Sequence, residues 1–249
     1  MNRGLVRAAW RVTPFKRQIK RTYYSSFNPL YWVRIARACA ILAFDFGLLR
    51  SMVRRACVTP AGEPLPWYSY PATEFLNQFD FGGRTVFEYG CGNSTVFWSR
   101  RARRVVSVEH EAEWYEEVRR MVGPNVELLH ERDPDQYIAA VHRFDERYDV
   151  IVIDGQSRLR CAREALTRMN RGGFIILDNS DWFPDTSKTL RDSGLLEVDF
   201  FGFGPLNDYT SATSVYFDRS CTLQPAGGRQ PVPGIGSLPK DFDEAWWKE

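Results

Sequence analysis

One segment, residues 85–109, constrains the fold of this chain more than any other. It reads as a strand, a glycine turn, a helix and a second strand. Thr85 to Tyr89 is apolar and β-prone, and the two glycines of the turn, residues 90–93, permit positive φ and close approach of a ligand to the backbone. Ser94 or Thr95 can cap the helix, whose free N–H groups then face the ligand. This order predicts a site for a nucleotide-type cofactor.

Two acids flank the turn and narrow the class of cofactor. Glu109 closes the second strand, where an acid accepts the hydroxyls of a ribose. Glu88 precedes the turn, where it suits a cationic amino group and would repel a pyrophosphate. The dinucleotide pattern GxGxxG also needs a third glycine, and Thr95 stands in its place. The residues favour a ligand with an ammonium group; the alternative is an ordinary turn with a solvated glutamate at the strand end.

Strands and helices alternate through the rest of the central region. After the first two strands, strands are predicted at 126–129, 148–154, 173–177, 197–203 and 214–218, and helices at 112–121, 134–141, 159–169 and 186–192. Near-continuous apolar strands between helices indicate an α/β fold with a parallel sheet covered on both faces. The last two strands have no room for a crossover helix between them, so they should pair antiparallel.

The pattern acid-x-Gly-x-Gly-x-Ser, followed by an acid closing the next strand, resembles the class I S-adenosylmethionine-dependent methyltransferases. The segments EYGCGNST, LDNSD and FGFGP resemble a bacterial methyltransferase-like subgroup without an assigned substrate. The resemblance spans about residues 85–218 and implies a Rossmann-like sheet of parallel strands with an antiparallel last strand. It implies that S-adenosylmethionine is held by Glu88, Gly90, Gly92, Asn93, Ser94, Glu109 and Asp133. Glu88 and the glycines would surround the methionine part, Glu109 the ribose, and Asp133 the adenine amino group; Asp133 as a plain helix start is the alternative.

Oxygen-bearing side chains follow two neighbouring strands at the predicted ligand edge of the sheet. Asp154 follows one strand, and Asp178 with Asn179 follows the next. This set resembles the metal triad of the catechol-type, cation-dependent O-methyltransferases and implies Mg²⁺, a hard ion that oxygen ligands bind. The histidine that often follows in relatives is replaced by Gln156, Ser157 and Arg158, and the alternative is that the two aspartates cap turns or contact the cofactor. Asp154 is the first candidate for a catalytic base, with His110 and His130 behind it.

The resemblance implies methyl transfer to a hydroxyl of a small molecule or glycan. Two other classes stay open: an NAD(P)-linked oxidoreductase or epimerase, and a non-catalytic scaffold that keeps the fold at a membrane. Trp67, Tyr68 and Tyr70 are candidates to line the pocket or to cement the linker to the core. Asn207, Asp208 and Tyr209 are candidate substrate contacts in a loop that otherwise serves as a bend.

The chain is predicted to have four parts, the first of which is set apart by its charge. Residues 1–57 hold twelve Lys and Arg but a single acid, Asp45, and Tyr31 to Leu49 has helical apolar spacing with basic flanks. A basic helical N-terminal segment of this kind suits an anionic membrane surface. Packing on the core as a lid is weighed above this, and a transit peptide and a nucleic-acid contact are weighed below it. Residues 58–84 read as linker and leading helix, 85–219 as the methyltransferase domain, and 220–249 as an extended tail in which Trp246 and Trp247 anchor the chain or meet a partner.

Cysteine usage indicates the compartment. Five cysteines are scattered without any CxxC pair, which argues against a disulfide scaffold or zinc site and for a reducing compartment. We therefore expect a cytoplasmic protein, with the N-terminal segment in peripheral contact with the inner membrane face.

Overall fold

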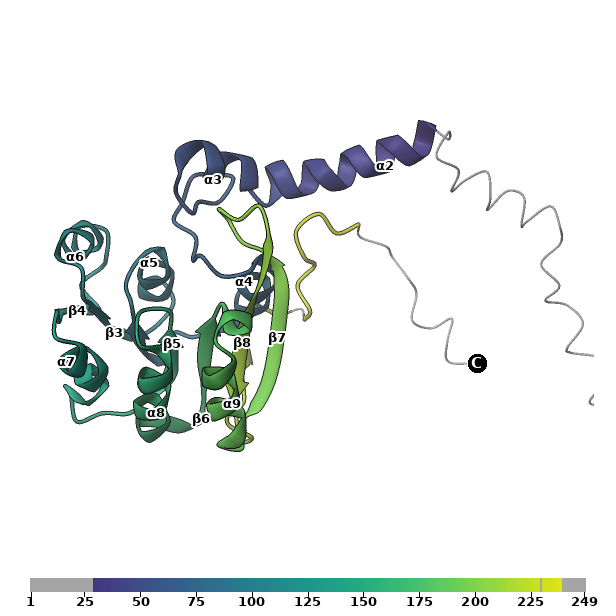
Figure 1. Ribbon diagram of the computed structural model, residues 1–249. Coiled ribbons are helices and arrows are strands. Elements are labelled where there is room, and N and C mark those ends of the chain that lie inside the picture. The colour runs from purple at the N-terminus through teal and green to yellow at the C-terminus, as the bar shows by residue number, and fades with distance from the viewer. Residues whose placement is uncertain (1–28, 229, 239–249) are drawn as a thin grey trace, which may run out of the picture.

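A seven-stranded sheet organises the molecule (Figure 1). The computed structural model describes residues 29–228 and 230–238. The strand order is β4-β3-β2-β5-β6-β8-β7, with β2 to β6 parallel and β8 antiparallel to both β6 and β7. The strands are β2 (Thr85–Tyr89), β3 (Arg104–Glu109), β4 (Val126–His130), β5 (Tyr148–Ile153), β6 (Met169–Asp178), β7 (Leu196–Phe203) and β8 (Thr210–Phe217). The predicted α/β fold class with its antiparallel last strand is confirmed.

Helices cover both faces of the sheet, which explains the apolar strands. Along β5, Val150 and Val152 pack on one face with α4 and α5, whereas Ile151 and Ile153 pack on the other with α7, α8 and α9. All four are fully buried, as expected for a central parallel strand. The helices are α4 (Tyr70–Leu76), α5 (Asn93–Ser99), α6 (Ala112–Arg119), α7 (Pro134–Ala139), α8 (Arg158–Arg168) and α9 (Pro184–Asp192), with short turns η2 (Ala140–His142) and η3 (Ser180–Trp182).

From residue 29 on, the N-terminal segment forms two helices where one was predicted over residues 31–49. They are α2 (Pro29–Ala40), continued by the π-helical turn η1 (Ile41–Asp45), and α3 (Leu48–Arg54). Gly47 separates them with φ of +79°, in the left-handed region that favours glycine. No residue of α2 is buried, and the helix projects from the rest of the molecule (Figure 1). A lid packed on the core is therefore not what α2 forms in this structure.

Two short strands lie beside the main sheet. β1 (Phe79–Asp80) pairs antiparallel with β9 (Gln224–Pro225), which brings the chain after β8 back to the end of α4. The other basic residues of the N-terminal segment, before residue 29, and the paired Trp246 and Trp247 lie outside the described residues. None of the helices in the described ranges is both long enough and apolar enough to cross a membrane.

Candidate active site

The turn after β2 is held tightly against the end of β5. Gly90 has φ of +88°, and its N–H donates to the carbonyl oxygen of Val108 at 2.9 Å. A Cβ at this position would lie 3.1 Å from the Cα of Gly155. Gly92 differs, because its φ of 167° is ordinary extended backbone and a Cβ there would meet only the Trp114 ring, at 3.5 Å. Only Gly90 thus needs glycine for the protein's own conformation.

Glu109 ties this turn to the end of β3. Its carboxylate is 4% exposed, and Oε2 accepts from the Cys91 N–H at 3.1 Å. Oε1 accepts from the N–H groups of His110 and Glu111 at 2.8 and 2.9 Å, and the His110 ring nitrogen Nδ1 lies 2.8 Å away. The acid that was predicted to hold a ribose therefore stands directly behind the backbone of the glycine turn.

Glu88 lies on the other side of the turn and is fully buried. Its Oε2 accepts from the hydroxyls of Thr95 at 2.5 Å and Ser107 at 3.0 Å, and Thr95 Oγ1 in turn accepts from the Gly92 N–H at 2.9 Å. Thr95, which replaces the third glycine of a dinucleotide site, thus fixes the acid. Oε1 of Glu88 has no hydrogen-bond partner among the described residues. Burial raises the pKa of Glu88 to about 7, against the lowering effect of the hydroxyl groups that donate to it.

A cavity of about 470 Å³ opens in front of the glycine turn. Trp114 of α6 covers one side, and its Nε1 donates to the Cys91 carbonyl oxygen at 2.6 Å. The Asn93 side chain is fixed by a hydrogen bond, because its amide donates to the Cys57 carbonyl oxygen at 2.8 Å. The first cavity is lined by Arg55, Ala56, Cys57, Trp67, Cys91, Gly92, Asn93, Ser94, Trp114, Glu117, Met121, Asp154 and Leu206. Its size falls in the usual range for a small-molecule or cofactor site.

A second cavity of about 330 Å³ adjoins the first and shares Trp67 and Asp154 with it. The Trp67 indole N–H donates to Oδ1 of Asn207 at 2.8 Å, which joins the linker to the loop between β7 and β8. The rings of Trp182 and Tyr209 lie 5.9 Å apart on another wall. The second cavity is lined by Trp67, Asp154, Arg158, Asp178, Asn179, Trp182, Asn207 and Tyr209.

Asp154 stands where the two cavities meet. Its side chain is 25% exposed, and Arg158 Nη2 donates to Oδ1 at 3.0 Å. Burial raises the pKa of Asp154 to about 6, although the Arg158 guanidinium opposes this shift. Asp178 is almost fully buried, and its Oδ1 accepts from the Thr213 hydroxyl at 2.6 Å. Burial and the nearby Asp154 raise the pKa of Asp178 well above its ordinary value.

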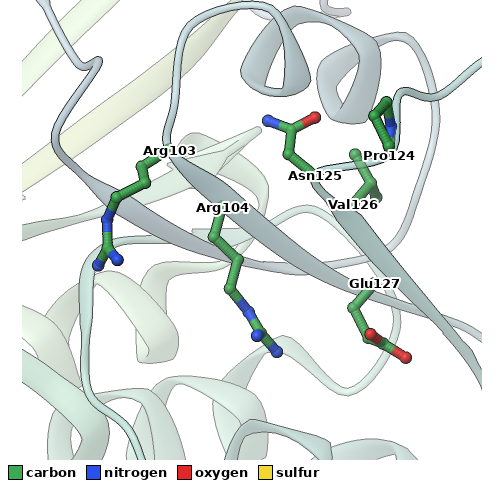
Figure 2. A pocket seen from close by; sticks show the side chains of 6 residues that line it. All are labelled: Arg103, Arg104, Pro124, Asn125, Val126 and Glu127. Carbon is green, nitrogen blue, oxygen red and sulfur yellow. The ribbon is translucent and has the colours of Figure 1, made fainter.

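A further cavity of about 320 Å³ lies at the opposite ends of the strands (Figure 2). Figure 2 shows Arg104 and Glu127 at its wall, next to the amino ends of β3 and β4. Arg104 is paired there with Glu146 at 3.3 Å. Open parallel sheets bind ligands at the carboxyl ends of their strands, so the first and second cavities are the candidate active site.

Comparison with known proteins agrees with this arrangement. A family model described as a methyltransferase domain matches residues 87–180. The fold is that of a class I methyltransferase. No curated protein matches the sequence. The resemblance inferred from the glycine turn and its two acids is confirmed at the level of the fold, and the region matched contains Glu88, Glu109, Asp154 and Asp178.

Several solved methyltransferase structures are similar to this chain. One is an O-methyltransferase from Bacillus cereus in complex with S-adenosylhomocysteine, 18% identical with a TM-score of 0.49, covering 71% of this chain and 91% of that one. Another is the O-methyltransferase TomG from Streptomyces achromogenes, involved in tomaymycin synthesis and in complex with S-adenosylmethionine, 15% identical with a TM-score of 0.48, covering 72% and 89%. A precorrin-6y C5,15-methyltransferase from Geobacter metallireducens is 13% identical with a TM-score of 0.49, covering 59% and 87%. At these values the neighbours identify no acceptor.

Some of the residues predicted for the site do not line either cavity. Asp133 is exposed, and its Oδ1 accepts from the N–H groups of Asp135 and Gln136 at 3.0 and 2.9 Å, so it caps α7 and lines neither cavity. Tyr68 and Tyr70 are buried in the core, whereas Trp67 lines both cavities. Asp208, His110 and His130 line neither cavity. Glu88, Gly90 and Glu109 are not among the lining residues of either cavity, whereas Gly92, Asn93 and Ser94 line the first.

The Arg158 side chain lies among the three predicted metal-binding residues, and it meets Asp178 through the backbone carbonyl and not through the carboxylate. Arg158 donates to Asp154 Oδ1 and to the Asp178 carbonyl oxygen, and it reaches Asn179 Oδ1 at 3.5 Å. Within residues 29–228 and 230–238, no three His, Cys, Asp or Glu side chains are grouped to hold a metal ion. The Mg²⁺ prediction therefore finds no support in this geometry. Sequence reasoning missed Arg158 and Trp114, whose roles depend on contacts with distant segments.

Proposed function

We propose that this protein transfers a methyl group from S-adenosylmethionine to a hydroxyl of a small molecule or glycan. The observation that carries the proposal is the meeting of two cavities at Asp154, one against the glycine turn and one beside it. Such a meeting would bring a cofactor in the first cavity and an acceptor in the second into contact at one carboxylate. Positioning of this kind supplies most of the catalysis in a reaction whose donor is already reactive.

The residues around the turn fit the cofactor. The unpartnered Oε1 of buried Glu88 would accept from the ammonium group, and Oε2 of Glu109, which accepts one hydrogen bond in this structure, would take a ribose hydroxyl. Gly92 leaves the backbone edge open to the ligand, with Asn93 and Ser94 beside it and Gly90 shaping the turn. S-adenosylmethionine supplies an electrophilic methyl group when bound. Contact of Asp133 with the adenine stays a prediction. Its side chain caps α7, which favours the alternative that Asp133 only begins this helix.

Asp154 would accept the proton of the acceptor hydroxyl. Arg158 holds Oδ1, whereas Oδ2 has no hydrogen bond to the described part of the chain. With a pKa of about 6, the carboxyl is mostly ionised at neutral pH yet more basic than an ordinary aspartate. Asp154 is thus suited to general-base catalysis where the cavities meet.

The second cavity favours a neutral acceptor. Two carboxyl groups, two amide side chains and three aromatic rings line it, and Arg158 is the one cation among its lining residues. All five N–H groups of that guanidinium already face protein acceptors. A hydroxyl-bearing molecule without phosphate or carboxylate groups would meet hydrogen-bonding partners and aromatic surface there, whereas an anion would meet repulsion.

Calorimetric titration with S-adenosylmethionine, S-adenosylhomocysteine and NAD tests the cofactor. We expect binding of the first two and none of NAD, and a loss of about tenfold or more in affinity in Glu88→Gln and Glu109→Gln. Selective NAD binding would support an oxidoreductase or epimerase, and binding of none of the three would support a non-catalytic scaffold.

The acceptor can be sought with a radiolabelled methyl donor. We expect label to enter neutral sugars or phenols rather than their phosphorylated counterparts. Asp154→Asn should lower kcat by about 100-fold or more while leaving the affinity for S-adenosylmethionine unchanged. An unchanged kcat in this variant would remove Asp154 from the role of base.

Peripheral contact with an anionic membrane is a separate proposal, and so is a cytoplasmic location. The first is supported by exposed apolar side chains of α2, such as Val33 and Ile35, next to Arg37. The second is supported by the five cysteines, all of which are free thiols. Cosedimentation with vesicles containing anionic lipid tests membrane contact; equal recovery with neutral vesicles, or none with either, would reject it.

A further inference from the structure

A single guanidinium occupies the centre of the predicted metal site. Arg158, in the first turn of α8, has a side chain that is only 10% exposed. Its Nε donates to the Gly155 carbonyl oxygen at 3.0 Å, and its Nη2 donates to the Asp154 carbonyl oxygen at 3.2 Å and to Oδ1 at 3.0 Å. Its Nη1 donates to the Asp178 carbonyl oxygen and approaches Asn179 Oδ1 at 3.5 Å. Each of the five N–H groups therefore has an acceptor.

These contacts join the loops that follow β5 and β6. Ser157 and Asn179, one on each loop, have positive φ angles of 52° and 47°, which non-glycine residues seldom adopt. The guanidinium also lies over the ring of Phe183, 4.4 Å from its centroid. Acceptors on both loops and the ring of Phe183 therefore hold the Arg158 side chain in one position, whereas an arginine on the surface would be free to change rotamer.

We propose that Arg158 is the permanent cation of this site and that the protein takes no divalent metal there. A divalent ion at the same place would compete with the guanidinium for Oδ1 of Asp154, the Asp178 carbonyl oxygen and Oδ1 of Asn179. The Asp178 carboxylate does not contact the guanidinium and accepts from the Thr213 hydroxyl instead. The divalent ion would also stand against a fixed positive charge, since arginine does not lose its proton in proteins. Arg158 joins the two strand ends, as a shared metal ion would, and leaves Oδ2 of Asp154 free. It is a positioning residue, because it acts through Asp154.

Binding of Mn²⁺, followed by electron paramagnetic resonance of the full-length protein, tests this proposal without cofactor or acceptor. The wild-type protein should leave the spectrum of free Mn²⁺ unchanged up to about 1 mM, the weak end of protein sites for hard cations. Arg158→Ala should bind Mn²⁺, because it leaves Asp154, Asn179 and the Asp178 carbonyl around an uncharged space. Arg158→Lys keeps a cation and should bind none. Arg160→Ala, which removes an exposed arginine from the same helix, is the matched control.

Loss of the free Mn²⁺ signal with the wild-type protein overturns the proposal, whatever the variants do. Failure of folded Arg158→Ala to bind Mn²⁺ overturns the role of the arginine. Should that variant not fold, Arg158→Gln, which keeps much of the stem but no charge, carries the same expectation. A second test uses the methyl-transfer activity and so rests on the proposed function. EDTA should leave the methyl-transfer rate of the wild-type protein unchanged, and loss of that rate in EDTA would contradict the proposal. Because the spectroscopic arm needs no substrate, it stands even if the proposed function fails.

Discussion

Among single residues, Glu88 of the candidate site lowers the stability of the folded protein. The carboxyl is fully buried, and burial raises its pKa from 4.5 to about 7. Thr95 and Ser107 donate to one oxygen and leave the other unpartnered. A buried acid with unused hydrogen-bonding capacity costs folding free energy and is usually found where a ligand will meet it.

Glu88→Gln should stabilise the protein in alkaline but not in acidic solution. Between about pH 4.5 and 7 the unfolded chain releases this proton while the folded chain keeps it, so the free energy of unfolding falls as pH rises. The loss is on the order of 3 kcal/mol above this window and is absent below it. Urea denaturation of both proteins at about pH 4.5 and 8 measures the difference. Glu127→Gln, at an exposed glutamate, is the control, and an equal gain at both pH values would refute the prediction.

Protonation of Asp154 should cause the loss of kcat at acidic pH. Its carboxylate is the form that accepts a proton, and the carboxyl has a pKa of about 6. The value of kcat should therefore fall about tenfold per pH unit below this value and reach a plateau above it. A pH profile with saturating substrates measures this dependence. A profile that stays level well below pH 6 would contradict the assignment of Asp154 as base.

Among the structural elements, the turn between β2 and α5 contains two glycines, and the structure requires a glycine at only one of these positions. Gly90 has a left-handed backbone and nearly touches Gly155, whereas Gly92 is extended and has space around it. The first is required by the protein, and the second is open toward the first cavity. The Gly-x-Gly pattern thus serves folding at one position and leaves the backbone open toward a cavity at the other.

Alanine substitutions should separate these two roles. Gly90→Ala should lower the free energy of unfolding by about 1–3 kcal/mol, because it combines backbone strain with a close contact. Gly92→Ala should leave stability within about 0.5 kcal/mol and weaken S-adenosylmethionine binding, since its methyl group would stand where the cofactor approaches. Thermal unfolding and calorimetric titration measure both effects. Equal destabilisation by the two variants would show that this distinction is wrong.

At the scale of the whole molecule, α2 contributes no buried residue to the fold. In the described part of this segment, contacts with the core come after α2. The Phe46 ring packs against the Tyr70 ring of α4, with centroids 4.8 Å apart, and buried Ser51 of α3 donates to the Val58 carbonyl oxygen at 2.9 Å and accepts from its N–H at 3.2 Å. The described core therefore depends on Phe46, α3 and the elements after them in the chain, and not on α2.

Deletion of residues 29–40 should keep the melting temperature of the full protein within about 2 °C, because no residue of α2 is buried. Ser51→Ala, which removes the anchoring hydroxyl, should lower the free energy of unfolding by about 1 kcal/mol. Differential scanning calorimetry of both variants provides the comparison. A large drop on removing α2 would mean that it packs on the core in solution.

The α/β class, the glycine turn and the acids at the strand ends could all be predicted from the amino-acid sequence. These follow from short-range rules: apolar runs form buried strands, glycine permits positive φ at position 90, and residues after parallel strands share one edge. The same rules placed Asp154, Asp178 and Asn179 together, and the structure brings them to one cavity.

The side chain that lies between those residues could not be predicted in this way, because it depends on how distant segments pack. Arg158 reaches Asp178 and Asn179 because β6 lies beside β5, and Trp114 reaches Cys91 because α6 folds back over the turn. Asp133 shows the converse, since two N–H groups of its own helix take the side chain that sequence resemblance assigned to a cofactor. Contacts between residues far apart in the chain have no local sequence signal, and it is these contacts that place a guanidinium where oxygen ligands alone predicted a metal ion.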